Sequence, residues 1–135
     1  MQVNSASRHL SITIEATAAD VYRYASDPRN LPEWAAGLAD RTVRRVDGQW
    51  IADSPMGTVV VAFAAQNSYG VLDHDVTLPS GETVYNPMRV IPNGAGCEVV
   101  FTLRPRPEMS AADFDRDAAA VAADLARLRA ITERR

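Results

Sequence analysis

The sequence predicts an α+β fold. A curved antiparallel sheet of about seven strands wraps around a long C-terminal helix, and two short helices follow the first strand. Strand-like segments follow one another almost without interruption between residues 41 and 104. Residues 110–135 carry an apolar stripe at helical spacing. A run of consecutive hairpins this long must curl, and the helical stripe provides a cover for its apolar concave face.

The first strand and the two short helices come from the N-terminal part of the chain. The segment HLSITIEA (9–16) alternates apolar and polar side chains, which predicts a half-buried strand. Thr17 is a good N-cap for a helix over 17–26, with Asp20 three residues later in the capping-box position. A second short helical stretch is expected over 27–38, where an internal proline makes a long regular helix improbable.

Six further strands are expected before the C-terminal helix. Their segments are 41–46, 49–53, 58–66, 69–78, 82–90 and 96–104. Residues typical of turns separate the neighbouring segments. These turns are Asp47-Gly48, Ser54-Pro55-Met56-Gly57, Asn67-Ser68, Pro79-Ser80-Gly81 and Asn93-Gly94.

The long C-terminal helix is expected to begin at Ser110, which forms a second capping box with Asp113. Aspartates are frequent in its first turns and arginines in its last, which complements the helix macrodipole. Its apolar stripe recurs every three or four residues. The stripe consists of Phe114, Ala118, Val121, Leu125, Leu128 and Ile131.

Length and charge limit the possible functions. The 135 residues fit one domain, 1–135, and the net charge of −3 argues against nucleic acid, which requires a basic surface. No apolar run approaches the length of a membrane span, and the N-terminal residues lack the apolar core of a signal peptide. A cytoplasmic protein is therefore expected.

Missing residue types exclude several kinds of chemistry. All 14 basic residues are arginine, so Schiff-base and pyridoxal chemistry lack their lysine. The two histidines, His9 and His74, are far apart, and Cys97 is the one cysteine. Such a set argues against a zinc site, and we expect neither a metal nor a cofactor.

The segment SITIEATAADVYRYASDPRNLPEWAAGL (11–38) resembles the opening of the SRPBCC superfamily, also called START-like or birch-pollen-allergen-like. The superfamily includes polyketide cyclase/dehydrase and lipid-transport members. The order of strands and the C-terminal helix agree with it over nearly the whole chain. The resemblance implies a helix-grip fold with a deep cavity between sheet and long helix, and a single START-like ligand-binding domain. Members bind lipids, sterols or polyketides, and some are enzymes or bind protein partners.

Turn lengths predict which side chains face this cavity, because they fix the strand register. The expected turns place Phe63 opposite Leu72 and Val90 opposite Cys97, with apolar pairs on a single inward face. Trp50 is expected inward beside Val61. The cavity residues predicted in this way, with helix residues and Trp34 added, are Trp34, Trp50, Val61, Phe63, Leu72, His74, Asn86, Met88, Val99, Phe101, Phe114, Val121 and Leu125.

His74 lies between two acids in the sequence, but Asp73-His74-Asp75 is not expected to form a catalytic unit. Successive side chains of a strand point to opposite faces, so His74 points inward and both acids outward. The outward acids are expected to form a solvated cluster of small energetic value with Tyr85 and Arg89.

Three roles remain open for the inward pair of His74 and Asn86. The two side chains bond each other or a water and do nothing more, or they orient a polar group of a ligand. In the third role His74 is the catalytic residue, as the one inward group with a suitable pKa, while Asn86 or Arg45 steadies an oxyanion. Arg45 is either at the cavity rim or a solvated strand residue.

The leading hypothesis is a protein that binds a small hydrophobic molecule, lipid or polyketide-like, with a hydroxyl or carbonyl on its hydrophobic body. The alternatives are an enzyme of polyketide cyclase/dehydratase type and a protein-interaction module resembling Hsp90-activating or toxin-like relatives. His74 is expected to be neutral near neutral pH, because burial disfavours its charged form.

Overall fold

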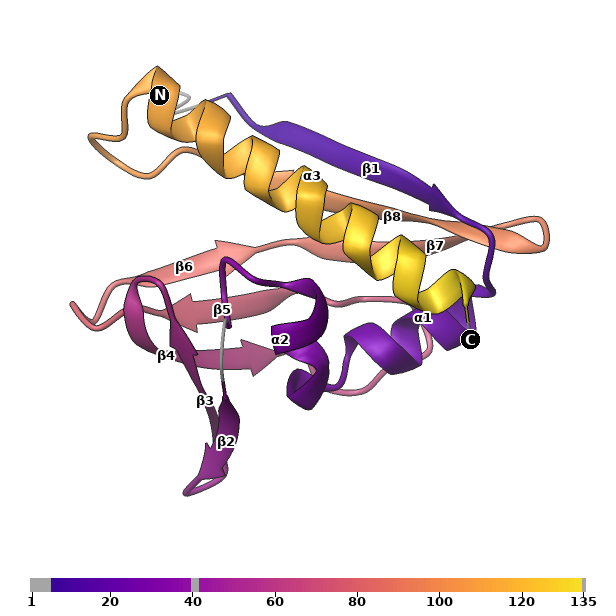
Figure 1. The fold of residues 1–135 in the computed structure, drawn as a ribbon, viewed down its shortest axis with the longest axis horizontal. Helices are drawn as coiled ribbons and strands as arrows, with labels where there is room; N and C mark the ends of the chain where they lie inside the picture. The colour runs from indigo at the N-terminus through magenta and orange to yellow at the C-terminus, as the bar shows by residue number, and fades with distance from the viewer. Residues whose placement is uncertain (1–5, 40–41, 135) are drawn as a thin grey trace.

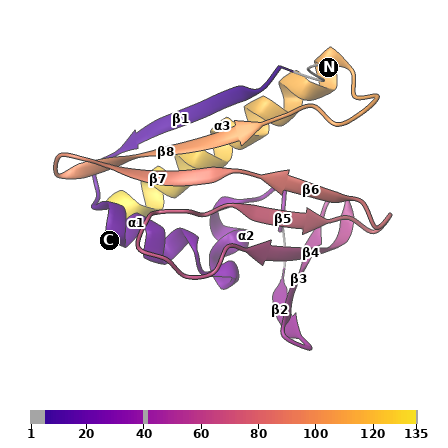
Figure 2. The same ribbon diagram turned by 180° about the vertical axis from the view of Figure 1, so that it is seen from behind.

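The computed structural model describes residues 6–39 and 42–134, and it confirms the α+β fold and the long C-terminal helix. The elements are, in order, β1 (Arg8–Ile14), α1 (Ala18–Ala25), η1 (Pro28–Asn30), α2 (Leu31–Trp34), β2 (Val43–Val46), β3 (Gln49–Ser54), β4 (Gly57–Phe63), β5 (His74–Thr77), β6 (Thr83–Asn86), β7 (Met88–Asn93), β8 (Gly96–Leu103) and α3 (Ala111–Glu133). Arg41, the first residue of the predicted second strand, lies outside the described residues. Figures 1 and 2 show α3, α1 and α2 on one face of the strands.

The described strands number eight and form two antiparallel sheets, where about seven in one sheet were predicted. The sheet orders are β1-β8-β7 and β2-β3-β4-β5-β6. The additional strand arises at Pro87, which lies between β6 and β7 and divides the predicted strand 82–90. Proline has no N–H to donate to a strand ladder, so the chain changes partners there. The amide of Leu72 still donates to the Met88 carbonyl at 2.8 Å, which links the two sheets.

Both predicted helix caps are present. The Thr17 hydroxyl accepts a hydrogen bond from the Asp20 amide at 3.1 Å, and the Ser110 hydroxyl accepts one from the Asp113 amide at 3.0 Å. These caps fix where α1 and α3 begin. The start of α3 decides which of its residues face the sheet, and Leu125 and Leu128 on that face are almost completely buried.

The hairpin between β4 and β5 differs from the predicted tight turn at Asn67-Ser68. Asn67 instead organises a wide loop, because its side-chain oxygen accepts hydrogen bonds from the amides of Tyr69 and Val71, each at 3.0 Å. Phe63 therefore pairs with His74 and not with Leu72. The shift is two residues, so every side chain keeps its predicted face.

A second shift of the same size occurs between β7 and β8. The predicted turn at Asn93-Gly94 would place Val90 opposite Cys97, but Asn93 pairs with Gly96 and Val90 pairs with Val99. Gly94 has a φ of +60°, so the two-residue turn begins at this glycine and not one residue earlier. The inward face again stays the same.

The outward acids differ in their surroundings. Tyr85 and Arg89 are neighbours of Asp73, as predicted, but Asp73 is not solvated, since its side chain is only 14% exposed. Its carboxylate accepts hydrogen bonds from the Tyr85 hydroxyl at 2.7 Å, the Met88 amide at 2.9 Å and the Arg89 guanidinium at 2.8 and 3.0 Å. It thus provides the partner that the Met88 amide lacks beside Pro87. Arg89 first, and then Tyr85 and the Met88 amide, hold the pKa of Asp73 well below its ordinary value.

We therefore expect Asp73→Asn to lower the free energy of unfolding by about 2 kcal/mol, because a charged acceptor of several hydrogen bonds is lost. Asp75→Asn is the matched control, since Asp75 is exposed on the same face, and its effect should stay within about 0.5 kcal/mol. A lowered carboxyl pKa stabilises the fold above the ordinary pKa of about 4 and loses this effect as the pH falls further. Urea unfolding at about pH 7 and about pH 3 measures both effects. Equal stability of the two variants at neutral pH would contradict the stabilising role of the Asp73 carboxylate.

None of the helices in the described ranges is long and apolar enough to cross a membrane.

The predicted stripe of α3 lies on the sheet: Phe114, Ala118, Leu125 and Leu128 are buried, and Val121 and Ile131 are half-buried. One end of the molecule is densely packed, where α1 contributes Val21 and Tyr24 to the same core as Leu128. Space remains further along α3, toward its N-terminal half.

Candidate functional site

A cavity of about 340 Å³ lies between α3 and the strands, and we call it the α3 cavity. Its volume is at the small end of the range of about 300–1,000 Å³ that is typical of ligand pockets. The wall from the sheet contains His74, Val76 and Leu78 of β5 and its end, and the wall from the helix contains Val121 and Leu125. The segment from Trp34 to Leu38 closes one side.

Six of the predicted cavity residues line it: Trp34, His74, Asn86, Phe101, Val121 and Leu125. The other seven are not among its lining residues: Trp50, Val61, Phe63, Leu72, Met88, Val99 and Phe114. Most of these seven have the predicted inward direction, but they are packed into the core at the α1 end or along the sheet. Alternation along a strand indicates which face is buried, while the position of the helices decides where that face is left open.

Trp50 pairs with Val61 as predicted, yet it lies away from the α3 cavity. The β2–β3 hairpin extends away from α3, as Figure 1 shows. Arg45 is opposite Trp50, and its guanidinium carbon lies 5.6 Å from the centre of the Trp50 ring. Arg45 is exposed, which matches a solvated strand residue that stacks on an aromatic ring.

His74 is the central polar group of the cavity wall. Its ring lies between two aromatic rings, with centroids 4.9 Å from Phe63 and 5.9 Å from Phe101. The Nδ1 atom is 2.9 Å from the Leu72 carbonyl oxygen. A carbonyl can only accept, so Nδ1 carries the hydrogen and Nε2 of the neutral ring has a free lone pair.

Burial lowers the pKa of His74 below its ordinary value, against the Leu72 hydrogen bond and the charges of Asp73 and Asp75, which raise it. This direction agrees with the neutral ring that we expected. Nε2 has no hydrogen-bond partner among the described residues. It is also accessible to solvent, because Nε1 of Trp34 is the one side-chain nitrogen or oxygen of the described residues that is both unpaired and inaccessible. Nε2 is therefore an acceptor that opens into the α3 cavity.

Asn86 is paired with His74 across β5 and β6, as predicted, but the two side chains do not bond each other. The Asn86 side-chain nitrogen donates to the Val84 carbonyl at 3.3 Å. Each of the two residues thus bonds the carbonyl two positions before it in its own strand. The bond to the Leu72 carbonyl occupies Nδ1 of His74 and leaves Nε2 free.

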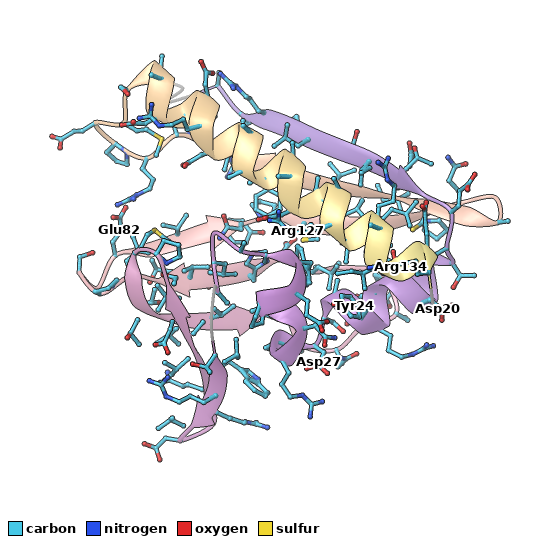
Figure 3. All side chains as sticks on the ribbon, viewed as in Figure 1. Asp20, Tyr24, Asp27, Glu82, Arg127 and Arg134 are labelled. Carbon is cyan, nitrogen blue, oxygen red and sulfur yellow. The ribbon has the colours of Figure 1, made fainter. Side chains whose placement is uncertain are left out.

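Trp34 ends α2, and α3 holds its backbone in place. The Arg127 Nε donates to the Trp34 carbonyl at 3.3 Å, and Arg127 also forms an ion pair with Asp124, from the side of α3 that faces α2 (Figure 3). The indole itself is only 3% exposed. Its Nε1–H is closed off from solvent and has no acceptor in the described part of the chain.

Asp124 is an acid on the wall of the cavity that the sequence analysis missed. Burial raises its pKa to about 6, although Arg127 and the backbone amide of Ala36 both favour the charged form. A carboxyl group is often functional when burial raises its pKa by more than its ion pair lowers it. A sequence signal was present, since Asp124 follows Val121 by three residues, a spacing at which two side chains lie on the same face of a helix.

The mouth of the cavity is formed by loops and turns that no periodic pattern could have indicated. Arg106, in the loop before α3, pairs with Glu82 of the β5–β6 turn at 2.7 Å, and Figure 3 shows Glu82 facing that loop. Met56, from the β3–β4 turn, is 50% exposed at this mouth. These contacts bring together segments that are far apart in sequence.

A wider depression of about 850 Å³ lies on the outside, between α1 and the 66–70 loop. It is open, and its arginines are already paired: Arg23 with Asp20 and Arg29 with Asp27, each at 2.9 Å. The α3 cavity has a more apolar lining and is bordered by His74, whose Nε2 is unpaired, so we treat it as the candidate site. Within residues 6–39 and 42–134, no three histidine, cysteine, aspartate or glutamate side chains come together as metal ligands.

Known structures share this fold at low sequence identity. A protein named XoxI from Bacillus cereus has a TM-score of 0.73 at 13% identity, covering 94% of this chain and 95% of that one. The protein Ara h 8.0201 has a TM-score of 0.71 at 10% identity, covering 98% and 100%. The Zhui aromatase/cyclase from Streptomyces sp. R1128 has a TM-score of 0.71 at 14% identity, covering 98% and 96%. At these identities the likeness concerns the fold alone.

No curated protein matches the sequence. The family described as "Polyketide cyclase / dehydrase and lipid transport" matches residues 5–133. This range contains α1 and α2, all the strands and α3. The chain therefore belongs to the polyketide cyclase / dehydrase and lipid transport family, within the SRPBCC superfamily that its N-terminal segment resembles.

Proposed function

We propose that this protein binds a small hydrophobic molecule, lipid or polyketide-like, in the α3 cavity. The observation that carries the proposal is an apolar pocket with a free acceptor on its wall, Nε2 of a neutral His74. Ligand pockets are mostly apolar and contain a few polar groups that orient the ligand. The family match supports the same function, since its description includes lipid transport.

Native mass spectrometry of the purified protein tests this function, with wild type and His74→Phe measured side by side. Phenylalanine keeps the aromatic contacts with Phe63 and Phe101 but has no acceptor, so the fold should persist. We expect wild type to retain or take up a hydrophobic compound, and His74→Phe to bind a hydroxyl-bearing compound about tenfold more weakly. Equal loading of both proteins would remove His74 from the site. Absence of any bound lipid or aromatic compound would refute the proposed function and favour a protein-interaction module.

A second candidate function is acid–base catalysis of cyclase or dehydratase type. Two titratable groups whose pKa values are shifted in opposite directions line the same cavity. A lowered pKa keeps His74 neutral on the sheet, and Asp124 exchanges its proton near pH 6 on the helix. Such a pair can supply a base and an acid near neutral pH. The same mass spectra separate the two functions, because a bound β-hydroxy ketone that loses one water over time indicates a reaction and an unchanged mass indicates binding.

A further inference from the structure

Strand β1 is an edge strand, and no other described strand pairs with its outer side. It pairs with β8 alone, and Figures 1 and 2 show it at the rim of the molecule. Its seven residues pair with β8 in one continuous register, and residues 9–14 include no proline, aspartate, glutamate or arginine. Proteins usually protect an exposed edge with charge, proline, a bulge or short length, so a long edge without them is a place where another strand can add.

The other sheet edges within the described ranges are protected. Strand β2 has four residues, two of them arginine, and β6 has four residues and is followed by a proline. The outer side of β7 is occupied by the 70–72 segment, through backbone hydrogen bonds of 2.8 Å at Met88 and Val90. Strand β1 is therefore the one long unprotected edge of the described strands.

Two hydrogen bonds show which backbone groups of β1 point outward. The Thr102 amide donates to the Pro87 carbonyl at 3.0 Å on the β7 side, so His9, which is opposite Thr102, has its N–H and C=O directed away from β8. The Glu15 amide also points outward, since it donates to the Glu133 carboxylate at 2.8 Å. These directions alternate along a strand. The residues of β1 whose backbone groups point outward are therefore His9, Ser11 and Thr13.

A second copy of β1 is complementary to this edge. In the antiparallel register that pairs all the outward groups, Ser11 lies opposite Ser11 of the second copy, and His9 exchanges hydrogen bonds with Thr13 of the second copy. On the inner face, Leu10 lies opposite Ile12 of the second copy, and both side chains are only half-buried within one chain. Apolar residues thus face each other on one side and hydroxyl groups on the other, and such cross-strand pairs stabilise a sheet.

The side of α3 that borders β1 leaves room for a second helix. Asp115 pairs with Arg8 at 2.6 Å, and Glu133 binds the Glu15 amide, so the side of α3 between these two acids runs along β1. Small side chains on this side allow two helices to pack closely. Its exposed residues, spaced by three or four, are Ala119, Ala122, Ala126 and Arg129.

The two ends of this surface are complementary in charge. In the antiparallel arrangement the start of one β1 lies beside the end of the other, so Arg8 comes near Glu133 of the second copy. Arg8 is 42% exposed, and its guanidinium then lies between Asp115 of its own chain and that second acid. Two-fold symmetry repeats the contact at the other end.

We propose that two copies of this chain form a symmetric dimer through β1, in which their β1-β8-β7 sheets join into one sheet and their α3 helices lie antiparallel, side by side. None of the residues of β1 lines the α3 cavity, so this inference does not depend on the proposed function.

Sedimentation velocity over a dilution series tests the dimer. Wild type should sediment with twice the chain mass of 14.7 kDa at high concentration and dissociate on dilution. Ser11→Lys places two like charges opposite each other on the symmetry axis and should weaken the dimer at least about tenfold. Ala62→Lys is the matched control, because Ala62 is exposed on β4, which has a strand on each side, and this variant should dimerise like wild type.

Cysteine cross-linking tests the register and does not depend on the lysine variants. Opposite residues that exchange hydrogen bonds have Cα atoms about 5.5 Å apart, a distance that a disulfide can span. Oxidation should therefore link two Ser11→Cys chains. Thr13→Cys is the control, since two copies of Thr13 would be about 14 Å apart and should not link. The native Cys97 is buried, so wild type should stay unlinked.

Three results would overturn the proposal. The first is a wild-type protein that stays monomeric over the whole dilution series. The second is a dimer that a folded Ser11→Lys protein retains, because the two copies would then meet through another surface. The third is equally rapid linking of Thr13→Cys and Ser11→Cys, because the chains would then lack the register with Ser11 on the symmetry axis.

Discussion

Gly70→Ala should lower the free energy of unfolding by at least about 4 kcal/mol, the largest effect that we expect of a single methyl group in this protein. Gly70 has a φ of +74°, which L side chains rarely adopt. A Cβ there would lie 2.1 Å from the Val90 carbonyl oxygen, and that atom belongs to the backbone of β7. The Gly70 carbonyl also accepts a hydrogen bond from the Val90 amide at 2.8 Å, so the two segments cannot separate without losing it.

Gly48→Ala is the matched control for this effect. Gly48 has a φ of +79°, but a Cβ there would meet no atom within 4 Å. It should therefore cost only the conformational penalty of about 1–2 kcal/mol. Urea unfolding gives the free energy of unfolding of each variant, and the difference between the two measures the cost of the clash at Gly70. If both variants were destabilised equally, the close approach of the 66–70 loop to β7 would be refuted.

Val121→Trp should abolish binding to the α3 cavity, with an affinity loss of at least about a hundredfold for a small hydrophobic compound that wild type binds, since the indole occupies the ligand's space. Val121 lines the cavity from α3 and is half-buried, so the larger side chain has room to enter it. Overpacking should cost the fold no more than about 1–3 kcal/mol. Calorimetry measures the affinity, and thermal unfolding checks that the variant is folded.

Ala123→Trp controls for the addition of an indole to the same helix. Ala123 is exposed and does not line the cavity, so this variant should bind like wild type. Unchanged binding by a folded Val121→Trp protein would place the ligand elsewhere, and the depression between α1 and the 66–70 loop would be the next region to test.

Local patterns in the sequence were sufficient for the fold class and for the order of the helices, but not for the division of the strands into two sheets. The caps at Thr17 and Ser110 act within one turn of helix, and alternation along each strand separates His74 from its acidic neighbours. The inward face was predictable even where the register was not. Both register errors, at Asn67 and at Asn93, were shifts of two residues, which leave the faces of a strand unchanged.

The register and the α3 cavity depend on contacts between segments that are distant in sequence. The side chain of Asn67 widened the hairpin loop, and Gly70 packs on β7, which no turn pattern reveals. The burial of Asp73 is a further case, since its carboxylate accepts hydrogen bonds from Met88 and Arg89, which lie 15 and 16 residues further along the chain.

By itself the sequence determined the fold class, the two helix caps and the inward direction of His74, because each depends on the period of a helix or strand. Tertiary structure decided which part of the inward face stays open, since α1 fills one end of the sheet while the 34–38 segment and the loop before α3 only border the other. It also decided the chemistry of the site. The inward position of His74 Nε2 on the cavity wall and the raised pKa of Asp124 both depend on elements that meet only in the folded chain.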